Sequence, residues 1–498
     1  MNHFLSLIKP NLPEESRFYL QSVQMREEAS AFMARIEGER KFVCLEIVSP
    51  SRLFDDFAGD IRKTPKGRLK ICPLTHANAE TLRKWFSFTR PVPFGRSGMS
   101  LGLGDRLGLA SPGHLRLLAH EKNVRPVLAQ QSVRELTLTE RTFGDVIDAA
   151  SWSVFQEGYT LGFGADGDHL KTAAEVREAL TEGCSMITLD CSNEIDNSII
   201  ELSSEEITTR YLALPAAARQ GWETRYLGKH FPLGTGEVHF EATDLQAIVV
   251  VYHKALAFIK EVFYSLIQPR GDVDFEISID ETLTSTTPEA HYFVAQELTR
   301  EGVEFTSLAP RFCGEFQKGI DYRGDLVQFE ADLKVHAEIA DHFGFRLSIH
   351  SGSDKFSVFP LIGQYTHGRV HVKTAGTNWL EAVRVIAQTN PFLYRQMHAY
   401  ALEHFAEAKK YYHVSTDLEQ IPHLESLTDK ELPILMDRDD SRQLLHISYG
   451  LLLTAKNQAG VPRFREAMFQ TLNDEEEHYA QALVRHIGKH IQLLHANR

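Results

Sequence analysis

Long hydrophobic runs are missing from this sequence. The closest candidate, residues 245–267, is interrupted by His253, Lys254, Lys260 and Glu261, so it predicts a buried helix and not a membrane span. The N-terminus lacks the basic, apolar and small-residue order of a secretory signal peptide. We therefore expect no membrane partner.

Cysteine and excess positive charge are also scarce. The five cysteines show no CxxC spacing, which is typical of reduced thiols in a cytoplasmic enzyme, although a pair between Cys184 and Cys191 stays open. The formal net charge is -14, whereas binding to a nucleic-acid backbone needs a basic stripe. We therefore expect no nucleic-acid partner. An anionic small molecule is still compatible, because local cations in a cleft decide its binding.

Two catalytic motifs are absent. No GxSxG nucleophile elbow occurs, which argues against a Ser-His-Asp hydrolase. His486 and His490 have i, i+4 spacing, but HIGKH lacks the glutamate of the HExxH zinc motif. We interpret these two histidines as part of the surface of an amphipathic terminal helix.

What the sequence does contain is an alternation of strand and helix patterns. Its central stretch is YTLGFGADGDHLK, residues 159–171, which begins as a strand, delivers acid, imidazole and amine groups, and leads through Thr172 as N-cap into a helix. Such order is typical of α/β enzymes, which present chemistry at the carboxyl ends of strands. Several later strands end in the same style. The strand–helix alternation gives about eight parallel-strand candidates between residues 41 and 373, among them 41–48, 68–72, 126–129, 185–190, 272–282, 303–312, 345–350 and 369–373.

This count predicts an α/β fold, a (β/α)8 TIM-barrel-like domain with a C-terminal helical extension. We assign residues 1–40 to a helical lead-in and 41–377 to the catalytic barrel, with an insertion near 191–241. Residues 378–498 contain only helical patterns and form the extension. That extension packs on the barrel or forms a contact in a homo-oligomer.

One strand has a polar and an apolar face. In residues 272–282, Asp274, Glu276 and Asp280 fall on one face, and Phe275 and Ile277 on the other. This alternation fits a barrel strand whose outer face packs on helices and whose inner face meets a polar site.

A glycine-rich loop, residues 94–113, includes GLGDRLG. It matches the dinucleotide fingerprint only loosely, and no clear strand precedes it. We predict a loop near the active site and keep nucleotide binding as an alternative.

Three histidines occupy analogous positions at strand ends: His169, His350 and His371. Imidazoles from separate strands converge at a barrel mouth, and neutral imidazole is a common ligand for zinc, nickel and related ions. We predict a divalent metal site, while hydrogen-bonded core histidines remain the alternative for each residue.

Acids and cations accompany these histidines. Asp168 and Glu276 are candidates for proton transfer, with ion pairing inside the barrel as the alternative. The predicted substrate-binding residues follow the same strands and offer cations, hydroxyls or backbone amides to a sugar or its carboxylate. They are Gln131, Ser132, Lys171, Arg311, Ser351, Ser353, Lys355 and Lys373.

Seven blocks of the chain together resemble the tagaturonate epimerase family. They are residues 101–114, 129–136, 155–171, 275–282, 347–356, 371–377 and 442–450. The resemblance implies a metal-dependent isomerase that interconverts D-tagaturonate and D-fructuronate. It implies Asp168 as proton acceptor, Glu276 as donor, and His169, His350 and His371 on a divalent cation (Zn, Ni, Mn or Co), with an acid in place of one histidine left open.

Several alternatives stay open at this point. The enzyme could act on neutral D-tagatose and D-fructose, or it could be another metal-dependent sugar isomerase or an aldolase. A non-catalytic regulator that binds a sugar or an anion is the hypothesis from another class. Carbon 4 of the ketose is not α to the ketone, so inversion there requires either retro-aldol cleavage or proton transfer after carbonyl migration.

Overall fold

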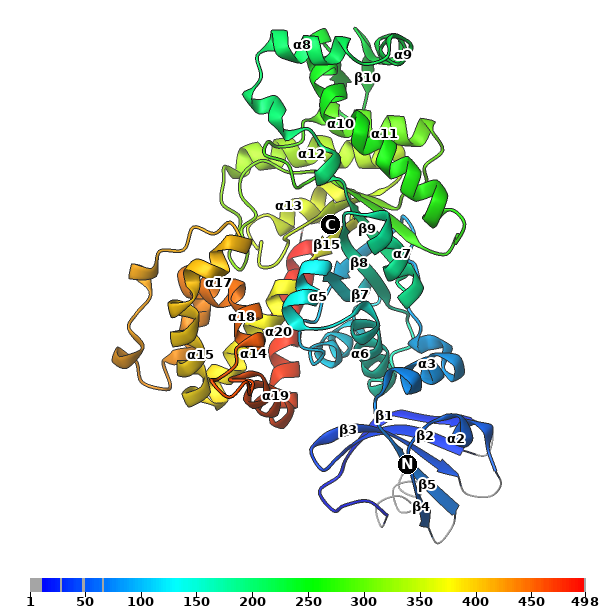
Figure 1. Ribbon diagram of the computed structural model, residues 1–498, viewed down its shortest axis with the longest axis vertical. Coiled ribbons are helices and arrows are strands. Elements are labelled where there is room, and N and C mark those ends of the chain that lie inside the picture. Colours follow the sequence, from blue (N-terminus) through cyan, green and yellow to red (C-terminus); the bar gives the residue numbers. More distant parts are fainter. Residues whose placement is uncertain (1–10, 27–28, 47–49, 65–66, 497–498) are drawn as a thin grey trace.

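Eight parallel strands close into a barrel in the computed structural model, which describes residues 11–26, 29–46, 50–64 and 67–496 (Figure 1). The last strand pairs back with the first, since His371 of β15 lies opposite Ser100 of β6. The (β/α)8 prediction is confirmed. The strands, in their order around the barrel, are β6 (Met99–Gly102), β7 (Val124–Ser132), β8 (Gly164–Leu170), β9 (Met186–Asp190), β12 (Asp274–Ser278), β13 (Ser307–Ala309), β14 (Arg346–Ile349) and β15 (Val370–Lys373).

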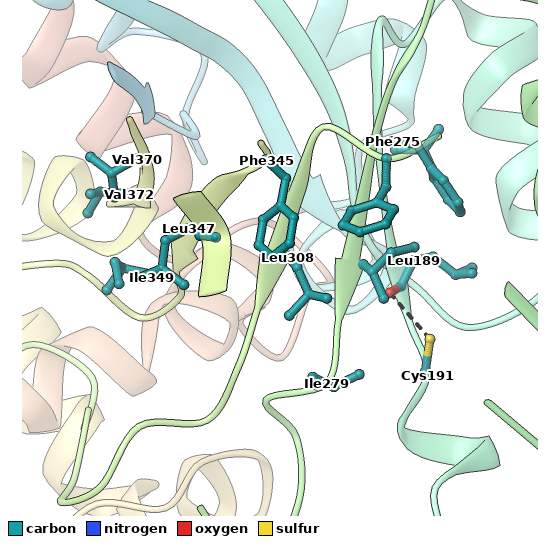
Figure 2. Packing of buried hydrophobic residues seen from close by; sticks show 14 of the residues in the cluster. Leu189, Cys191, Phe275, Ile279, Leu308, Phe345, Leu347, Ile349, Val370 and Val372 are labelled. Carbon is teal, nitrogen blue, oxygen red and sulfur yellow. Dashed lines mark hydrogen bonds between the residues drawn. The ribbon is translucent and has the colours of Figure 1, made fainter. Parts of the chain in front are cut away.

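Side chains alternate between the outside and the inside of the barrel along each strand. Phe275, Leu347 and Val372 belong to the apolar layer between strands and helices, seen in Figure 2. Glu276 and Lys373 point inward, where they form an ion pair. The two-faced pattern predicted for residues 272–282 is therefore confirmed, and it follows from the period of two along a strand.

Helices cover the outer face of the barrel. Their ends follow local capping rules: the Thr172 hydroxyl accepts a hydrogen bond from the Glu175 amide, as predicted, and Gly183 ends the same helix with φ +100°. The helices are α4 (Ser111–Leu118), α5 (Val133–Thr139), α6 (Phe143–Gln156), α7 (Ala173–Glu182), α10 (Ala242–Val262), α11 (Pro288–Arg300), α12 (Leu326–Phe343), α13 (Phe359–Thr366) and α14 (Ala375–Thr389).

Two barrel strands differ from their predicted positions. The first strand, β6, lies inside the glycine-rich loop, where its four residues were too short to be recognised. The strand predicted to begin at Tyr159 begins at Gly164 as β8, so the polar stretch ADGDHL is the strand itself and not the turn after it. In β8 the polar residues alternate with glycine and alanine. The strand therefore lacks the apolar pattern that usually marks a strand of a parallel barrel.

The N-terminal region is a five-stranded antiparallel sheet with the order β1-β2-β3-β5-β4. The strands are β1 (Arg17–Arg26), β2 (Ala29–Ile36), β3 (Glu39–Glu46), β4 (Asp60–Thr64) and β5 (Gly67–Cys72); α2 (Arg52–Asp56) and α3 (His76–Trp85) accompany them. In Figure 1 this sheet lies at one end of the molecule, beside α3 and α6.

The predicted helical lead-in over residues 1–40 is therefore wrong where the chain is described; residues 1–10 and 27–28 lie outside the described residues. Residues 41–46 and 68–72 are strands, as predicted, but they belong to this sheet and not to the barrel. The physical reason is that β2 is buried on both faces. Ala31 and Met33 pack on one apolar cluster, and Phe32 and Ala34 on the other, so the sequence shows no alternation.

Residues 191–241 lie between β9 and α10, in the range predicted as an insertion. They form α8 (Ser204–Leu212), α9 (Ala216–Tyr226) and a hairpin of β10 (His230–Pro232) and β11 (Glu237–His239), with two short 3-10 turns before them. Figure 1 places α8 and α9 at the end of the molecule opposite the N-terminal sheet. The region is thus more regular than its polar sequence indicated.

The C-terminal region is helical, as predicted, and has its own apolar cluster around Trp379 and Tyr449. Its helices are α15 (Pro391–Glu403), α16 (Phe405–Ala408), α17 (Asp439–Ile447), α18 (Tyr449–Thr454), α19 (Arg465–Asp474) and α20 (Glu476–His495). Helix α20 packs against α4, α13 and α14, so it joins this region to the barrel. Within the described part of the chain, no helix combines the length and apolarity that crossing a membrane requires.

Candidate active site

A cavity of about 430 Å³ lies at the carboxyl ends of the barrel strands. Residues in or just after β7, β8, β12, β13, β14 and β15 form its walls together with residues of α5 and of the C-terminal helical region. This is the end of a (β/α)8 barrel where catalytic side chains gather. The C-terminal region contributes Tyr411, Tyr412, His413 and His446, so the cavity is completed by both parts of the chain.

Three side chains in the cavity wall form a group that could hold a metal ion. One ligand atom from each of His169, Asp280 and His350 lies within 4.8 Å of the others. His169, the last residue but one of β8, has φ +53°, a left-handed conformation that is uncommon for a non-glycine residue. Asp280 lies two residues after β12, and His350 follows β14 directly.

Carboxylates hold both imidazoles in place. His169 Nδ1 lies 2.8 Å from Asp168 Oδ1, and His350 Nε2 lies 2.8 Å from Glu276 Oε1. The other nitrogen of His350, Nδ1, faces Asp280 at 3.1 Å. Two imidazoles and one carboxylate, with further carboxylates behind the imidazoles, are a donor set that fits a divalent transition metal.

The charges of this group are strongly coupled. Burial lowers the pKa of His350, but the negative charge of Asp280 outweighs burial and raises the pKa to about 9. Burial raises the pKa of Asp280 as well, and the charge of His350 brings it well below its ordinary value. Acids and imidazoles in this wall therefore stabilise one another's charged forms.

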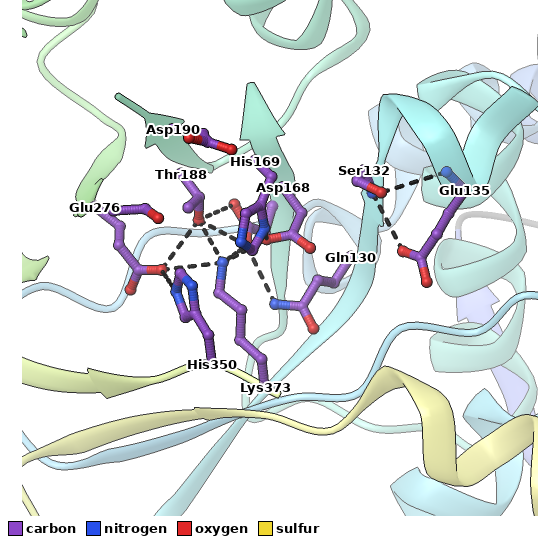
Figure 3. Close-up of polar contacts among 12 residues, drawn as sticks. Gln130, Ser132, Glu135, Asp168, His169, Thr188, Asp190, Glu276, His350 and Lys373 are labelled. Atoms are coloured by element: carbon purple, nitrogen blue, oxygen red, sulfur yellow. Dashed lines mark hydrogen bonds and ion pairs between the residues drawn. The ribbon is translucent and has the colours of Figure 1, made fainter. Parts of the chain in front are cut away.

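Lys373 is the centre of the polar network, as Figure 3 shows. Its Nζ lies 2.5 Å from Asp168 Oδ1, 3.0 Å from Glu276 Oε1 and 3.2 Å from Asp166 Oδ2. Burial lowers the pKa of Lys373, but three carboxylates outweigh this and raise it well above its ordinary value. One ammonium group thus fixes the two predicted proton-transfer residues relative to each other.

Asp168 and Glu276 occupy different positions in this network. Asp168 lines the cavity, whereas Glu276 is not one of the lining residues. Glu276 is fully buried and accepts a hydrogen bond of 2.6 Å from the Ser307 hydroxyl. Burial raises the pKa of Glu276, and Lys373 and His350 outweigh it, so the pKa lies well below the ordinary value. Its role as a proton donor stays a prediction, and its contacts place it behind His350.

His371 does not belong to the potential metal group. It is fully buried, and its Nδ1 lies 2.8 Å from Ser100 Oγ on the neighbouring strand. In the group of potential ligand atoms, Asp280 takes the place that the prediction gave to His371. The register explains this: His371 pairs with Ser348, two residues before His350, so its side chain lies deeper in the barrel than the cavity wall.

The structure divides the predicted substrate-binding residues. Those that line the cavity are Ser132, Arg311, Ser351, Ser353 and Lys373. Lys171 is instead paired with Glu281 at 3.2 Å and with Asp190 at 3.3 Å.

The remaining two are also outside the cavity wall. Lys355 is fully buried, and its Nζ donates to the carbonyl oxygens of Gln317, Ile320 and Ser353 at 2.6–2.9 Å. Gln131 is buried outside the wall, and its neighbour Gln130 lines the cavity instead. Lys171, Lys355 and Gln131 therefore lie outside the cavity wall, and their predicted role in binding the substrate has no support from this geometry.

Several cavity residues escaped the sequence-based prediction: Arg106, Gln130, Asp280, Lys318 and His446. Asp280 was recognisable from its place on the acidic face of β12. Gln130 lies in β7, Arg106 and Lys318 in loops, and His446 in α17, and no local pattern marks them.

The glycine-rich loop carries its own carboxylate. Asp105 accepts hydrogen bonds from the backbone amides of Leu107, Gly108, Ala110 and Ser111 at 2.6–3.2 Å. These are the groups that a phosphate would need. The geometry therefore argues against nucleotide binding, and the loop places Arg106 in the cavity wall as a part of the active site.

A second group of potential ligand atoms joins the barrel to α20. Asp354, His486 and His490 lie within 4.8 Å of one another, and the second carboxylate oxygen of Asp354 accepts from Arg442. His490 is fully buried, so the interpretation of these histidines as surface residues is wrong. Arg442 already supplies a positive charge to Asp354. We therefore interpret this group as an ion-pair network and not as a site for a metal cation.

Comparison with known proteins decides the family. The family model of tagaturonate epimerase (UxaE) matches residues 19–494. The chain belongs to the tagaturonate epimerase family. The resemblance seen in the seven sequence blocks is thus confirmed over nearly the whole chain.

Individual relatives of the chain support this family assignment. The chain is 43% identical over 427 residues to the tagaturonate/fructuronate epimerase of Thermotoga maritima, which covers 85% of this chain and 86% of the relative. Two crystal structures of the fructuronate-tagaturonate epimerase UxaE from Cohnella laeviribosi, a native form and a glycerol complex, superpose with a TM-score of 0.94 at 49% and 50% identity and cover 99% of both chains. The protein is an epimerase, an enzyme of the isomerase class.

Proposed function

We propose that this protein interconverts D-tagaturonate and D-fructuronate by inverting carbon 4 of the ketose, and that it needs a divalent metal. The observation that carries the proposal is the group of His169, Asp280 and His350 in the wall of a cavity at the carboxyl ends of the barrel strands. The epimerase activities of the relatives from Thermotoga maritima and Cohnella laeviribosi support the choice of substrate.

His169, Asp280 and His350 would hold the metal, because their donor atoms converge and carboxylates orient both imidazoles. Bound there, a zinc, nickel, manganese or cobalt ion would act as a Lewis acid on the substrate ketone.

Asp168 and Lys373 are the protein groups suited to move the hydroxyl proton of carbon 4. In a retro-aldol route, Asp168 takes this proton while the bond between carbons 3 and 4 breaks and its electron pair moves toward the ketone. The aldehyde fragment rotates, the bond forms on the opposite face, and Asp168 returns the proton. Lys373 holds Asp168 in place through its contact of 2.5 Å with Oδ1.

Glu276 contributes through other side chains in this proposal. Its Oε1 holds both His350 Nε2 and Lys373 Nζ. A direct donor role for Glu276 would require it to exchange these contacts for one with the substrate.

The runner-up function is epimerisation of neutral D-tagatose and D-fructose at carbon 4. A single experiment separates the two: metal-free enzyme is reconstituted with Zn, Ni, Mn or Co, and turnover of D-fructuronate and of D-fructose is followed by NMR. We expect metal-dependent inversion of D-fructuronate, with loss of activity in His169→Ala. Activity of fully metal-free enzyme would refute the metal requirement, and preferred turnover of D-fructose would favour the runner-up.

Solvent exchange tests the route in the same experiment. Retro-aldol cleavage keeps the hydrogen on carbon 4, so product formed in D₂O should carry no deuterium there. Deuterium at carbon 4 would instead indicate proton transfer after carbonyl migration.

The free state of the cysteines is relevant to the cellular location of the protein. All five are unpaired, at Cys44, Cys72, Cys184, Cys191 and Cys313. We propose a cytoplasmic location, which this free-thiol pattern supports.

A further inference from the structure

Arg106 and His446, two residues of the active-site cavity wall, carry buried polar atoms without hydrogen-bond partners among the described residues. Arg106 lines the cavity with 4% of its surface exposed, and its Nη1 has no hydrogen-bond partner among the described residues. The same holds for both ring nitrogens of His446, which is 1% exposed and also lines the cavity. Buried polar groups are nearly always satisfied, so unpaired groups on residues that line a cavity point to a ligand that satisfies them.

Contacts within the protein hold the Arg106 guanidinium in one orientation. Its Nε and Nη2 donate to Glu135 Oε1 at 3.0 and 2.7 Å, and its guanidinium lies 3.8 Å from the centre of the Tyr449 ring. These contacts fix the plane of the guanidinium and leave Nη1 free. A donor that is already immobilised loses little entropy when it binds an anion.

Lys318 adds a second cation close to Arg106. Its Nζ donates to Ser351 Oγ at 3.0 Å, and among the described residues no carboxylate lies within ion-pair distance of it. Burial lowers the pKa of Lys318, the charge of Glu135 opposes this, and the charges of Arg134 and Arg106 lower it further. Among the described residues, Glu135 forms an ion pair with Arg106, and no carboxylate forms one with Lys318, on which Glu135 and Asp168 act only through their charge. An additional anion would complete the set.

Around Lys373, carboxylates outnumber the cationic groups. There Lys373 is surrounded by the carboxylates of Asp166, Asp168 and Glu276. Figure 3 shows this cluster apart from Glu135, the partner of Arg106. A substrate with a carboxylate at one end would thus be oriented by charge, with its acid away from the metal group and toward Arg106 and Lys318.

We propose that Arg106 and Lys318, with His446 beside them, form the subsite that binds the carboxylate of the uronate and makes the enzyme selective for sugar acids over neutral ketoses. This inference rests on the proposed function. It differs from the sequence-based prediction, which offered Lys171, Arg311, Lys355 and Lys373 for this task. Among those, Arg311 is the one cavity-lining residue that remains as a competitor, since Lys373 is occupied by three acids and the others are outside the wall.

The test compares a sugar acid with a neutral sugar in metal-loaded enzyme. The KM of D-fructuronate and the inhibition constant of D-fructose against D-fructuronate turnover are measured for wild type, Lys318→Met, Lys318→Arg and Arg106→Lys. Lys229→Met, which removes an exposed lysine before β10, is the control for loss of one positive charge. Arg311→Met tests the competitor.

We expect Lys318→Met to raise the KM of D-fructuronate roughly 10- to 100-fold, as for loss of a hydrogen bond to a charged group, and to change the D-fructose constant less than about threefold. Lys318→Arg should recover most of the loss, while Arg106→Lys should lose affinity for the acid because a lysine cannot reproduce the fixed guanidinium.

Equal changes for both sugars, an unchanged KM in Lys318→Met, or a selective effect in Arg311→Met in place of Lys318→Met would overturn the inference. Failure of the wild-type enzyme to turn over D-fructuronate would instead refute the proposed function, so the two failures are distinguishable. Since Lys318 pairs with no buried acid, its variants test the subsite even where Arg106→Lys does not fold.

Discussion

Replacing Asp354 by asparagine should loosen helix α20 from the barrel. Asp354 accepts from Arg442 through one oxygen and lies 2.5 Å from His486 Nε2 through the other. The exposed fractions of the three side chains are 5%, 9% and 17%. The carboxylate therefore neutralises two cationic groups, one from α17 and one from α20, in a place that water hardly reaches.

The expected cost follows from this burial. Removing one partner of a buried ion pair leaves an uncompensated charge and destabilises by about 3–5 kcal/mol. A matched control is Asp341→Asn, because Asp341 also pairs with an arginine, Arg369, but with side chains that are 43% and 30% exposed. Such a surface pair contributes about 0–1 kcal/mol.

Hydrogen exchange followed by mass spectrometry measures the local effect. Peptides from residues 476–495 should exchange roughly 100- to 4,000-fold faster in Asp354→Asn, since each 1.4 kcal/mol corresponds to about a factor of ten in the opening equilibrium. The Asp341→Asn control should stay within about fivefold of wild type. Unchanged protection of this helix in Asp354→Asn would refute the conclusion that the buried ion pair holds α20 on the barrel.

Three further predictions concern charge and metal. Asp280→Asn should weaken divalent metal binding at least about 100-fold and His371→Gln less than about threefold, measured by calorimetry with Mn²⁺, and the reverse order would restore His371 as a ligand. Lys373→Met should lower the kcat for D-fructuronate by about 100-fold or more, because three carboxylates lose their shared cation, and near-normal turnover would contradict this role. Burial lowers the pKa of His486, but the negative charge of Asp354 outweighs burial and raises the pKa. The stability that this pair contributes is therefore complete below pH 6.5 and is lost as the pH rises through the folded-state pKa of His486. Protection of α20 should decline over that range in wild type, and a decline that persists in His486→Gln would rule out this histidine as its cause.

The barrel was predictable from the sequence because its strands obey a simple period. In β12, Phe275 and Ile277 alternate with Asp274 and Glu276, and burial against outer helices produces that pattern directly. The short strand β6 was missed, since four residues within a glycine-rich segment contain too few positions to show any period. The N-terminal sheet was missed because β2 packs apolar side chains on both faces.

The site was only half predictable for a different reason. Asp168, His169 and His350 come directly after or within strands, so their convergence follows from the fold class. Lys318 and His446 lie in a loop and in α17, and only tertiary packing brings them to the cavity. Residues of this kind carry no local pattern, because their position depends on how the C-terminal helices dock.

Strand register explains which histidine reaches the metal group. In parallel pairing, Ser348 lies opposite His371, so Lys373, two residues later, lies level with His350. A barrel strand presents alternate residues to its interior, and each step of two moves the side chain roughly 6.6 Å along the strand. His371 is therefore one step too deep to share an ion with His350, whereas Asp280, two residues beyond the end of β12, is at the right height. The same step places Lys373 at the height of Asp168 and Glu276, and a lysine at that level is what allows several carboxylates to remain ionised beside the substrate.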